Sequence, residues 1–201
     1  MLMPVPVLSI ILFIFIIWLQ YEIRKSQRKA KKDSDRFWDK EKQSNLTRRS
    51  DLSSLKYITL STANLPLDDK EDATINSYRD TILNLSDKKI LNLTGFTNTQ
   101  LKTEYGAANI KLLMEYDNNY TILVSMLHKW AERLYEKDFT EDAISVLEYA
   151  VSCQTDVTKT YRLLAKIYHK QNTPGKIDRL IDTVSKTTIP RKEELIQDLK
   201  R

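Results

Sequence analysis

Glycine, cysteine and histidine are scarce in this chain of 201 residues. It holds three glycines, one cysteine (Cys153) and two histidines, His128 and His169. So few glycines leave no glycine-rich phosphate-binding loop, and a single cysteine excludes an intrachain disulfide and any paired-cysteine motif. The two histidines do not form a His-Glu-x-x-His motif. We therefore expect no enzyme, no cofactor and no metal site.

The shortage of helix breakers favours an all-α protein. Only three glycines and five prolines interrupt a sequence dominated by good helix formers. Cys153 fits a small buried apolar side chain, and a lone cysteine fits a reducing compartment.

Positive charge is concentrated in one segment. The formal net charge is +5, yet residues 24–49 hold eleven Lys or Arg residues against four acids, and residues 50–201 are close to neutral. A nucleic-acid-binding domain carries its positive charge on the folded surface, so this distribution argues against a nucleic-acid partner.

The chain begins with an uncharged apolar run. Residues 1–19 contain no charged side chain, and the stretch from Met3 to Ile23 supplies roughly 20 positions, about the number a helix needs to cross a bilayer. A cleavable signal peptide would need basic residues before the run and small residues after it, and this chain has neither. We therefore expect residues 1–23 to be the transmembrane anchor of a single-pass membrane protein.

Basic residues follow this run and none precedes it. Because Lys and Arg stay on the cytoplasmic side, we expect the N-terminus outside and the C-terminal domain in the cytoplasm. Two roles stay open for these residues: contact with anionic lipid at the membrane surface, or setting the topology alone. They are Arg24, Lys25, Arg28, Lys29, Lys31 and Lys32.

The middle of the chain has a weaker pattern. We interpret residues 24–56 as a basic juxtamembrane tether and residues 57–120 as a helical lead-in or N-terminal cap, with a degenerate repeat as the alternative. Within it, residues 69–85 carry an apolar helical face, and Asn98 starts a short helix that ends at Gly106.

The last third of the chain repeats itself with a period of 34 residues. Each of seven apolar or small residues recurs 34 positions later without a gap, which is typical of stacked helical hairpins. In the first unit these residues are Leu127, Trp130, Ala131, Leu134, Ala143, Leu147 and Ala150. In the second they are Tyr161, Leu164, Ala165, Tyr168, Ile177, Ile181 and Val184.

The unit resembles the tetratricopeptide repeat family, which places a bulky residue, a large–small pair and an aromatic on the first helix and small residues on the second. Residues 121–188 match as two hairpins, and residues 189–201 form a C-terminal capping helix. Ile177 replaces a small residue, and Pro190 comes one position later than the family's closing proline. The resemblance implies an all-α superhelical repeat domain that binds proteins.

The same resemblance implies that a peptide lies along the concave face lined by the first helices. In the first unit this face holds Ser125, His128, Glu132, Tyr135 and Glu136. In the second it holds Lys159, Arg162, Lys166, His169 and Lys170. Since the second set is basic, we expect a protein or peptide partner of acidic character.

We therefore expect a membrane-anchored adaptor or scaffold that binds a partner on its cytoplasmic repeats. The alternatives are a fixed structural subunit of a larger membrane complex, and an enzyme whose site lies in residues 57–120. Replacing Lys159, Arg162 and Lys166 together with Glu tests the basic face, because capture of the partner should be lost without unfolding.

Overall fold

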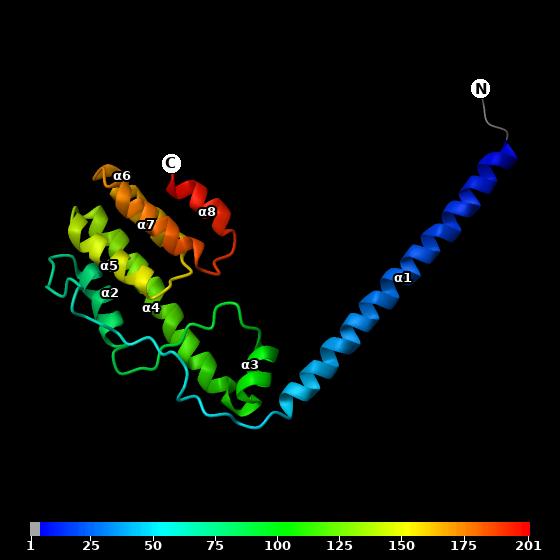
Figure 1. Cartoon of the computed structure of the whole chain (residues 1–201), viewed down its shortest axis with the longest axis horizontal. Helices are drawn as coiled ribbons and strands as arrows, with labels where there is room; N and C mark the ends of the chain where they lie inside the picture. The colour runs from blue at the N-terminus through cyan, green and yellow to red at the C-terminus, as the bar shows by residue number, and fades with distance from the viewer. Residues whose placement is uncertain (1–4) are drawn as a thin grey trace. The chain divides into compact units, whose positions relative to one another are not determined.

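The computed structural model describes the backbone of residues 5–201 and the side chains from Ser9 onward, and all regular structure in this part is helical (Figure 1). The elements are α1 (Val5–Asn45), α2 (Ala73–Leu83), α3 (Asn98–Tyr105), η1 (Ala107–Asn109), α4 (Ile110–Glu136), α5 (Thr140–Ser152), α6 (Thr158–Lys170), α7 (Pro174–Ser185) and α8 (Lys192–Leu199). They form two compact units. Unit 1 comprises residues 1–50 and 98–108, and unit 2 comprises residues 51–97 and 109–201.

The prediction of a transmembrane anchor over residues 1–23 is wrong. Among the described residues, no helix combines the length and the apolar character that a membrane crossing requires. In α1 the uncharged stretch stops at Tyr21, because Glu22 and Arg24 follow, and Met3 and Pro4 lie outside the described residues. The same finding contradicts the predicted single-pass membrane location and the orientation inferred from it.

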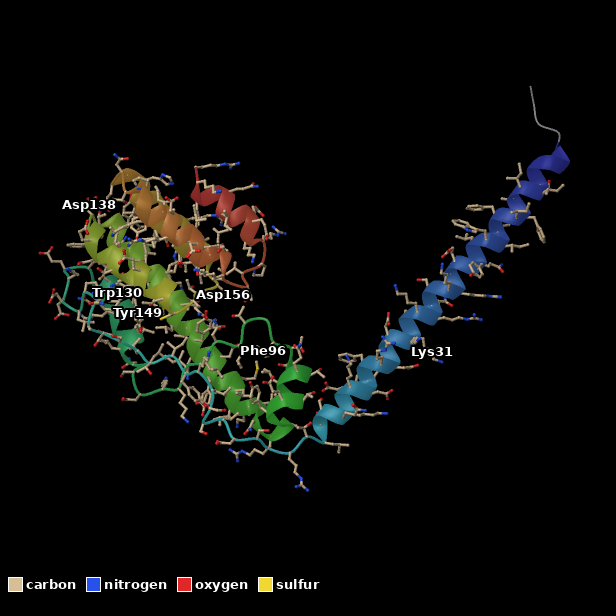
Figure 2. All side chains as sticks on the ribbon, in the orientation of Figure 1. Lys31, Phe96, Trp130, Asp138, Tyr149 and Asp156 are labelled. Atoms are coloured by element: carbon tan, nitrogen blue, oxygen red, sulfur yellow. The ribbon has the colours of Figure 1, made fainter. Side chains whose placement is uncertain are left out.

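The basic segment that we interpreted as a tether is helical for most of its length. α1 continues without a break to Asn45, and its side chains project from the ribbon on all sides, Lys31 among them (Figure 2). Good helix formers dominate residues 24–43, which explains why the helix persists there.

Unit 1 is held together where the end of α1 meets α3. Glu41 forms an ion pair with Lys102 and accepts a hydrogen bond of 2.8 Å from the Thr99 hydroxyl. These hydrogen bonds, that of Lys102 first, lower the pKa of Glu41. Gly106 ends α3 with a positive φ of 86°, and a Cβ there would lie 2.3 Å from the Arg48 carbonyl oxygen. Only glycine allows this close approach of the two segments.

Unit 2 is built around α4. Its buried residues follow one face of the helix, from Leu113 to Leu134, and α2 and α5 pack against that face. Asp72 joins α2 to α4, because its carboxylate accepts the Thr74 amide at the start of α2 (2.9 Å) and pairs with Arg133 on α4 (2.7 Å). The helix expected over residues 69–85 is therefore present from Ala73 to Leu83.

The helices after α4 pack in chain order, α5 on α4, α6 on α5, α7 on α6, and α8 on both α6 and α7. Each of the four connections contains one residue in the left-handed backbone region: Asp138, Gln154, Asn172 and Arg191. Phe139 is the N-cap of α5, and no side chain forms a capping hydrogen bond there. Pro174 begins α7, as expected for a proline in the first helical turn.

Candidate partner-binding face

The residues predicted to bind a partner lie on α4 and α6, and the structure brings some of them together. On α4, Tyr135 is half-buried, and the amines of Lys166 and Lys170 on α6 lie 5.8 Å and 5.2 Å from the centre of its ring. A lysine at this distance is attracted to the negative face of an aromatic ring. Tyr135 therefore links α4 to the basic side of α6.

His128 lies two turns before Tyr135 on α4 and is buried rather than exposed. Burial lowers the pKa of His128, the nearby Glu132 carboxylate acts in the opposite direction, and the Lys159 amine on α6 adds to the lowering. Its Nδ1 atom has no hydrogen-bond partner in the described part of the chain. At neutral pH the ring is therefore uncharged, and it is buried rather than presented on the face.

Arg162 and His169 do not belong to the open part of the face, because α8 engages both. The Arg162 guanidinium donates to Asp198 at 2.9 Å and 3.0 Å. The Nε2 atom of His169 lies 2.9 Å from the Leu199 carbonyl oxygen. Sequence reasoning predicted a capping helix but missed both contacts, since no spacing rule connects residues that far apart in the chain.

Three lysines on the exposed side of α6 form no ion pair in the described part of the chain. They are Lys159, Lys166 and Lys170. Other basic residues of unit 2 are paired across helices, as Lys70 is with Asp142 (2.8 Å) and Arg133 is with Asp72 (2.7 Å). The exposed side of α6 therefore presents three positive charges without an ion pair, two of them beside Tyr135. Ser125 is half-buried, whereas Glu132 and Glu136 are exposed.

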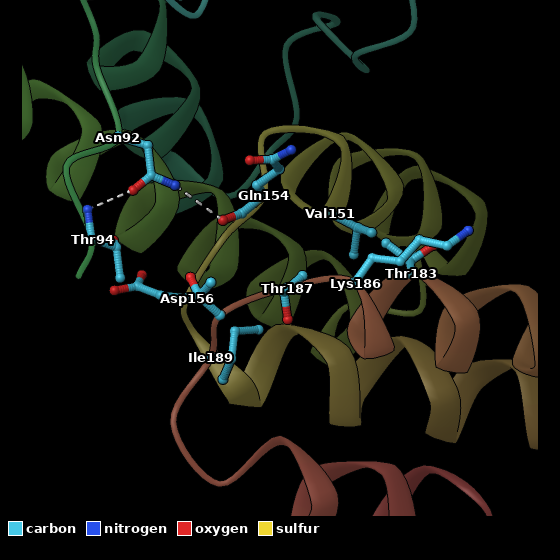
Figure 3. Close-up of a pocket in the computed structure, with 10 residues that line it drawn as sticks. Asn92, Thr94, Val151, Gln154, Asp156, Thr183, Lys186, Thr187 and Ile189 are labelled. Carbon is cyan, nitrogen blue, oxygen red and sulfur yellow. Dashed lines mark hydrogen bonds between the residues drawn. The ribbon is translucent and has the colours of Figure 1, made fainter. Parts of the chain in front are cut away.

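A second candidate is the hollow of about 310 Å³ beside the α5–α6 connection (Figure 3). The Asn92 amide donates to the Tyr120 hydroxyl (3.0 Å), which itself donates to the Gln154 carbonyl (2.7 Å). Burial, followed by the Asp156 carboxylate, raises the pKa of the neighbouring Tyr161 to about 12. These phenols stay neutral and serve to hold the connection in place.

The remaining candidates bring no catalytic group together. Within residues 57–120, the Lys89 amine lies over the rings of Tyr57 (5.1 Å) and Tyr116 (5.8 Å), a cation–π arrangement that packs the three side chains together. Burial raises the pKa of Cys153, which keeps it a thiol. Among the described residues, no three His, Cys, Asp or Glu side chains gather as a metal site would require.

The basic residues predicted to contact lipid all lie exposed on α1. Lys25 pairs with Glu22 at 3.6 Å, and the six residues share no pocket or bound partner. Their contact with anionic lipid stays a prediction.

Comparison with known proteins identifies no relative. No family model matches the chain, and neither the curated proteins nor the solved structures contain a match to it.

Proposed function

We propose that unit 2 is a helical-repeat domain that binds an acidic segment of another protein on the exposed side of α6 and the adjoining side of α4. The observation that carries this proposal is the set of three unpaired lysines along one side of α6, Lys159, Lys166 and Lys170, of which the last two lie over the Tyr135 ring. An acidic chain laid across them would form the ion pairs that the protein itself leaves unmade.

The arrangement of the helices supports the repeat part of the proposal. α5 begins at Thr140 and α7 at Pro174, and α6 begins at Thr158 and α8 at Lys192. Both pairs are 34 positions apart, as are the left-handed residues Asp138 and Asn172. Equivalent positions thus have equivalent local structure, which is what a stack of like hairpins requires.

The chain also shows on its own surface how α6 holds an acid. Asp198 of α8 meets Arg162 of α6 at 2.9 Å. Lys159 and Lys166, three and four positions from Arg162 on the same helix, and Lys170 form no such pair among the described residues. An external carboxylate would therefore do for these lysines what Asp198 does for Arg162.

The experiment compares two triple variants of the full chain. Lys159→Glu, Lys166→Glu and Lys170→Glu together should weaken binding of a fluorescent decaglutamate peptide at least about tenfold and abolish capture of the natural partner. The affinity of the unchanged protein should fall as salt is raised, because exposed charges are screened.

The matched control replaces Lys56, Lys88 and Lys111 with Glu. These lysines are exposed in unit 2, form no ion pair among the described residues and lie outside α6 and residues 125–136 of α4. The control should bind the peptide and the partner almost as the unchanged protein does. If the first variant keeps its helical circular dichroism and still captures the same proteins, the proposal is wrong.

A second function, as a fixed subunit of a larger complex, is favoured by α1. The large apolar side chains between Ile10 and Leu19 are 41% to 65% exposed in the chain alone. Such a run is normally covered by another apolar surface. A photocrosslinker at Ile14 should then give one adduct of defined size with a single protein; the absence of any protein adduct in cells would remove this alternative.

A further inference from the structure

The seat of α8 on unit 2 has the features of a helix-binding groove. α8 packs mainly against α6 and α7, and it buries Leu195 and Leu199 against them while Ile196 is partly covered. Leu199 stands four positions after Leu195 and three after Ile196, so the three apolar residues share one face of the short helix, as in an amphipathic helix that enters a groove.

Polar contacts at the same seat recognise the acid and the end of that helix. Arg162 holds the Asp198 carboxylate through two N–H donors, at 2.9 Å and 3.0 Å. The Nε2 atom of His169 meets the Leu199 carbonyl, one of the last carbonyls that a helix leaves unpaired. The groove therefore selects a carboxylate three residues after the first apolar anchor, and a helix that ends beside His169.

The attachment of α8 depends on this docking. A helix of eight residues does not persist alone in water. No side chain caps its start, and Arg191 just before it takes a left-handed conformation with φ of 56°. Short elements near a chain terminus open locally before the rest of a domain unfolds.

We propose that the α6–α7 seat is a docking site for a short acidic amphipathic helix of a partner protein, and that α8 fills it when the partner is absent. The partner helix would carry apolar residues at i, i+1 and i+4 and an acid at i+3, as α8 does with Leu195, Ile196, Leu199 and Asp198. Charge defines the chemistry of the partner, because the Arg162 guanidinium is complementary to an acid on the docked helix, as its pair with Asp198 shows. This site uses Arg162 and His169 rather than the three unpaired lysines, and it does not depend on them.

The effective concentration of α8 at its own seat determines whether a free peptide can displace it. A tethered helix acts on its own seat at an effective concentration in the millimolar range, so a free peptide cannot displace it at micromolar levels. Weakening the tethered helix without altering the seat should make the seat available.

The experiment therefore uses the full chain with Asp198→Lys, and a fluorescent peptide with the sequence of residues 190–201 as the probe. In this variant the amides of α8 should exchange with deuterium at least about tenfold faster than in the unchanged protein, while those of α6 keep their protection. The peptide should bind the variant at least about tenfold more tightly than it binds the unchanged protein.

Two variants sharpen the result. Gln197→Lys places a positive charge at the exposed residue next to Asp198, outside the first turn of α8, and it should behave as the unchanged protein does. Arg162→Glu combined with Asp198→Lys restores a pair of opposite charges. In this double variant α8 should dock again, and the peptide should not bind.

Each contrary outcome overturns the proposal. Loss of protection throughout α6 and α7 in Asp198→Lys would show that α8 is an integral part of the core. Intact protection without peptide binding would show that the seat accepts no external helix. A dimer that exchanges α8 between two chains would show that a second copy, not a partner, is the occupant.

Discussion

The two longest helices of the protein, α1 with 41 residues and α4 with 27, are stabilised in opposite ways. α4 buries one stripe, in which Leu113, Leu123, Leu127 and Leu134 are fully buried. α1 leaves its large apolar residues exposed, and in the described part of the chain it packs against α3 near its end, where Glu41 pairs with Lys102 and Ser44 is buried. Tertiary packing maintains α4, whereas local helix propensity maintains most of α1. An apolar sequence alone therefore does not indicate burial, whereas an apolar stripe of helical period does.

The charges of the two units differ in the same way. In unit 2 several basic residues contact acids across helices, as Arg133 does with Asp72. The basic residues of α1 lie in solvent, and the pair formed by Lys25 and Glu22 is local to the helix. Contacts between helices therefore determine where these positive charges of unit 2 lie. In α1 the positions of the basic residues follow from their sequence order along a single helix.

The largest effect should come from removing the buried ring of Trp130 in α4, labelled in Figure 2. Trp130 is 1% exposed, so Trp130→Ala leaves a cavity and loses apolar burial. We expect a loss of about 3–5 kcal/mol in the free energy of unfolding of unit 2, measured by urea denaturation.

The matched change in α1 is Ile14→Ala, at a side chain that is 60% exposed. It should leave the urea transition of unit 2 unchanged, because no core contact is lost. Equal destabilisation by the two variants would contradict the contrast between the helices.

The next effect concerns unit 1. Gly106→Ala should separate α3 from the end of α1, since the new Cβ would lie 2.3 Å from the Arg48 carbonyl oxygen on a backbone of positive φ. We expect about 2–3 kcal/mol of local strain, seen as faster hydrogen exchange in α3 with unit 2 unaffected. Gly95→Ala is the control, because φ there is also positive but nothing lies within 4 Å. If both variants exchange alike, the close approach to Arg48 has no structural role.

A smaller effect is expected at the junction of α2 and α4. Asp72→Ala removes both the N-cap of α2 and the pair with Arg133, and the midpoint of thermal unfolding should fall by several degrees. Asp72→Asn keeps an oxygen for the cap and loses the charge, so it should fall less. A midpoint that does not change in either variant would show that α2 is held by its apolar residues alone.

The repeat pattern predicted burial well because it depends on local spacing. Leu127, Trp130, Ala131 and Leu134 are all buried, and so are their counterparts from Tyr161 to Tyr168. In a helix of 3.6 residues per turn these positions lie on one side, whatever the remainder of the chain does. Ile181, on the edge of its stripe, is only partly buried.

The errors concern properties that spacing does not determine. A run of apolar residues indicated a membrane span, yet the described part of α1 does not reach the required length and apolar character. The predicted basic face included Arg162, which the structure turns toward Asp198. Its partner depends on the angle at which α8 docks, and that angle results from the packing of Leu195 and Leu199 rather than from any motif.

The smallest expected effect is a pH dependence that originates in the core of unit 2. Burial lowers the pKa of His128. The Glu132 carboxylate raises this pKa and the Lys159 amine on α6 lowers it, and the net result is a lowered pKa. The unfolded chain then binds a proton at a higher pH than the folded one, so the stability contributed by the neutral ring is complete above about pH 6.5 and declines as the pH falls below it. The free energy of unfolding should therefore be lower at pH 5.5 than at pH 7.5, a window above the range in which most carboxylates titrate.

His128→Leu should flatten this dependence, because leucine fills a similar volume and cannot be protonated. Urea titrations of both proteins at the two pH values measure this difference. A slope that survives in His128→Leu would place the titrating group elsewhere in unit 2, and it would mean that the burial of His128 on α4 is not what makes the domain respond to acid.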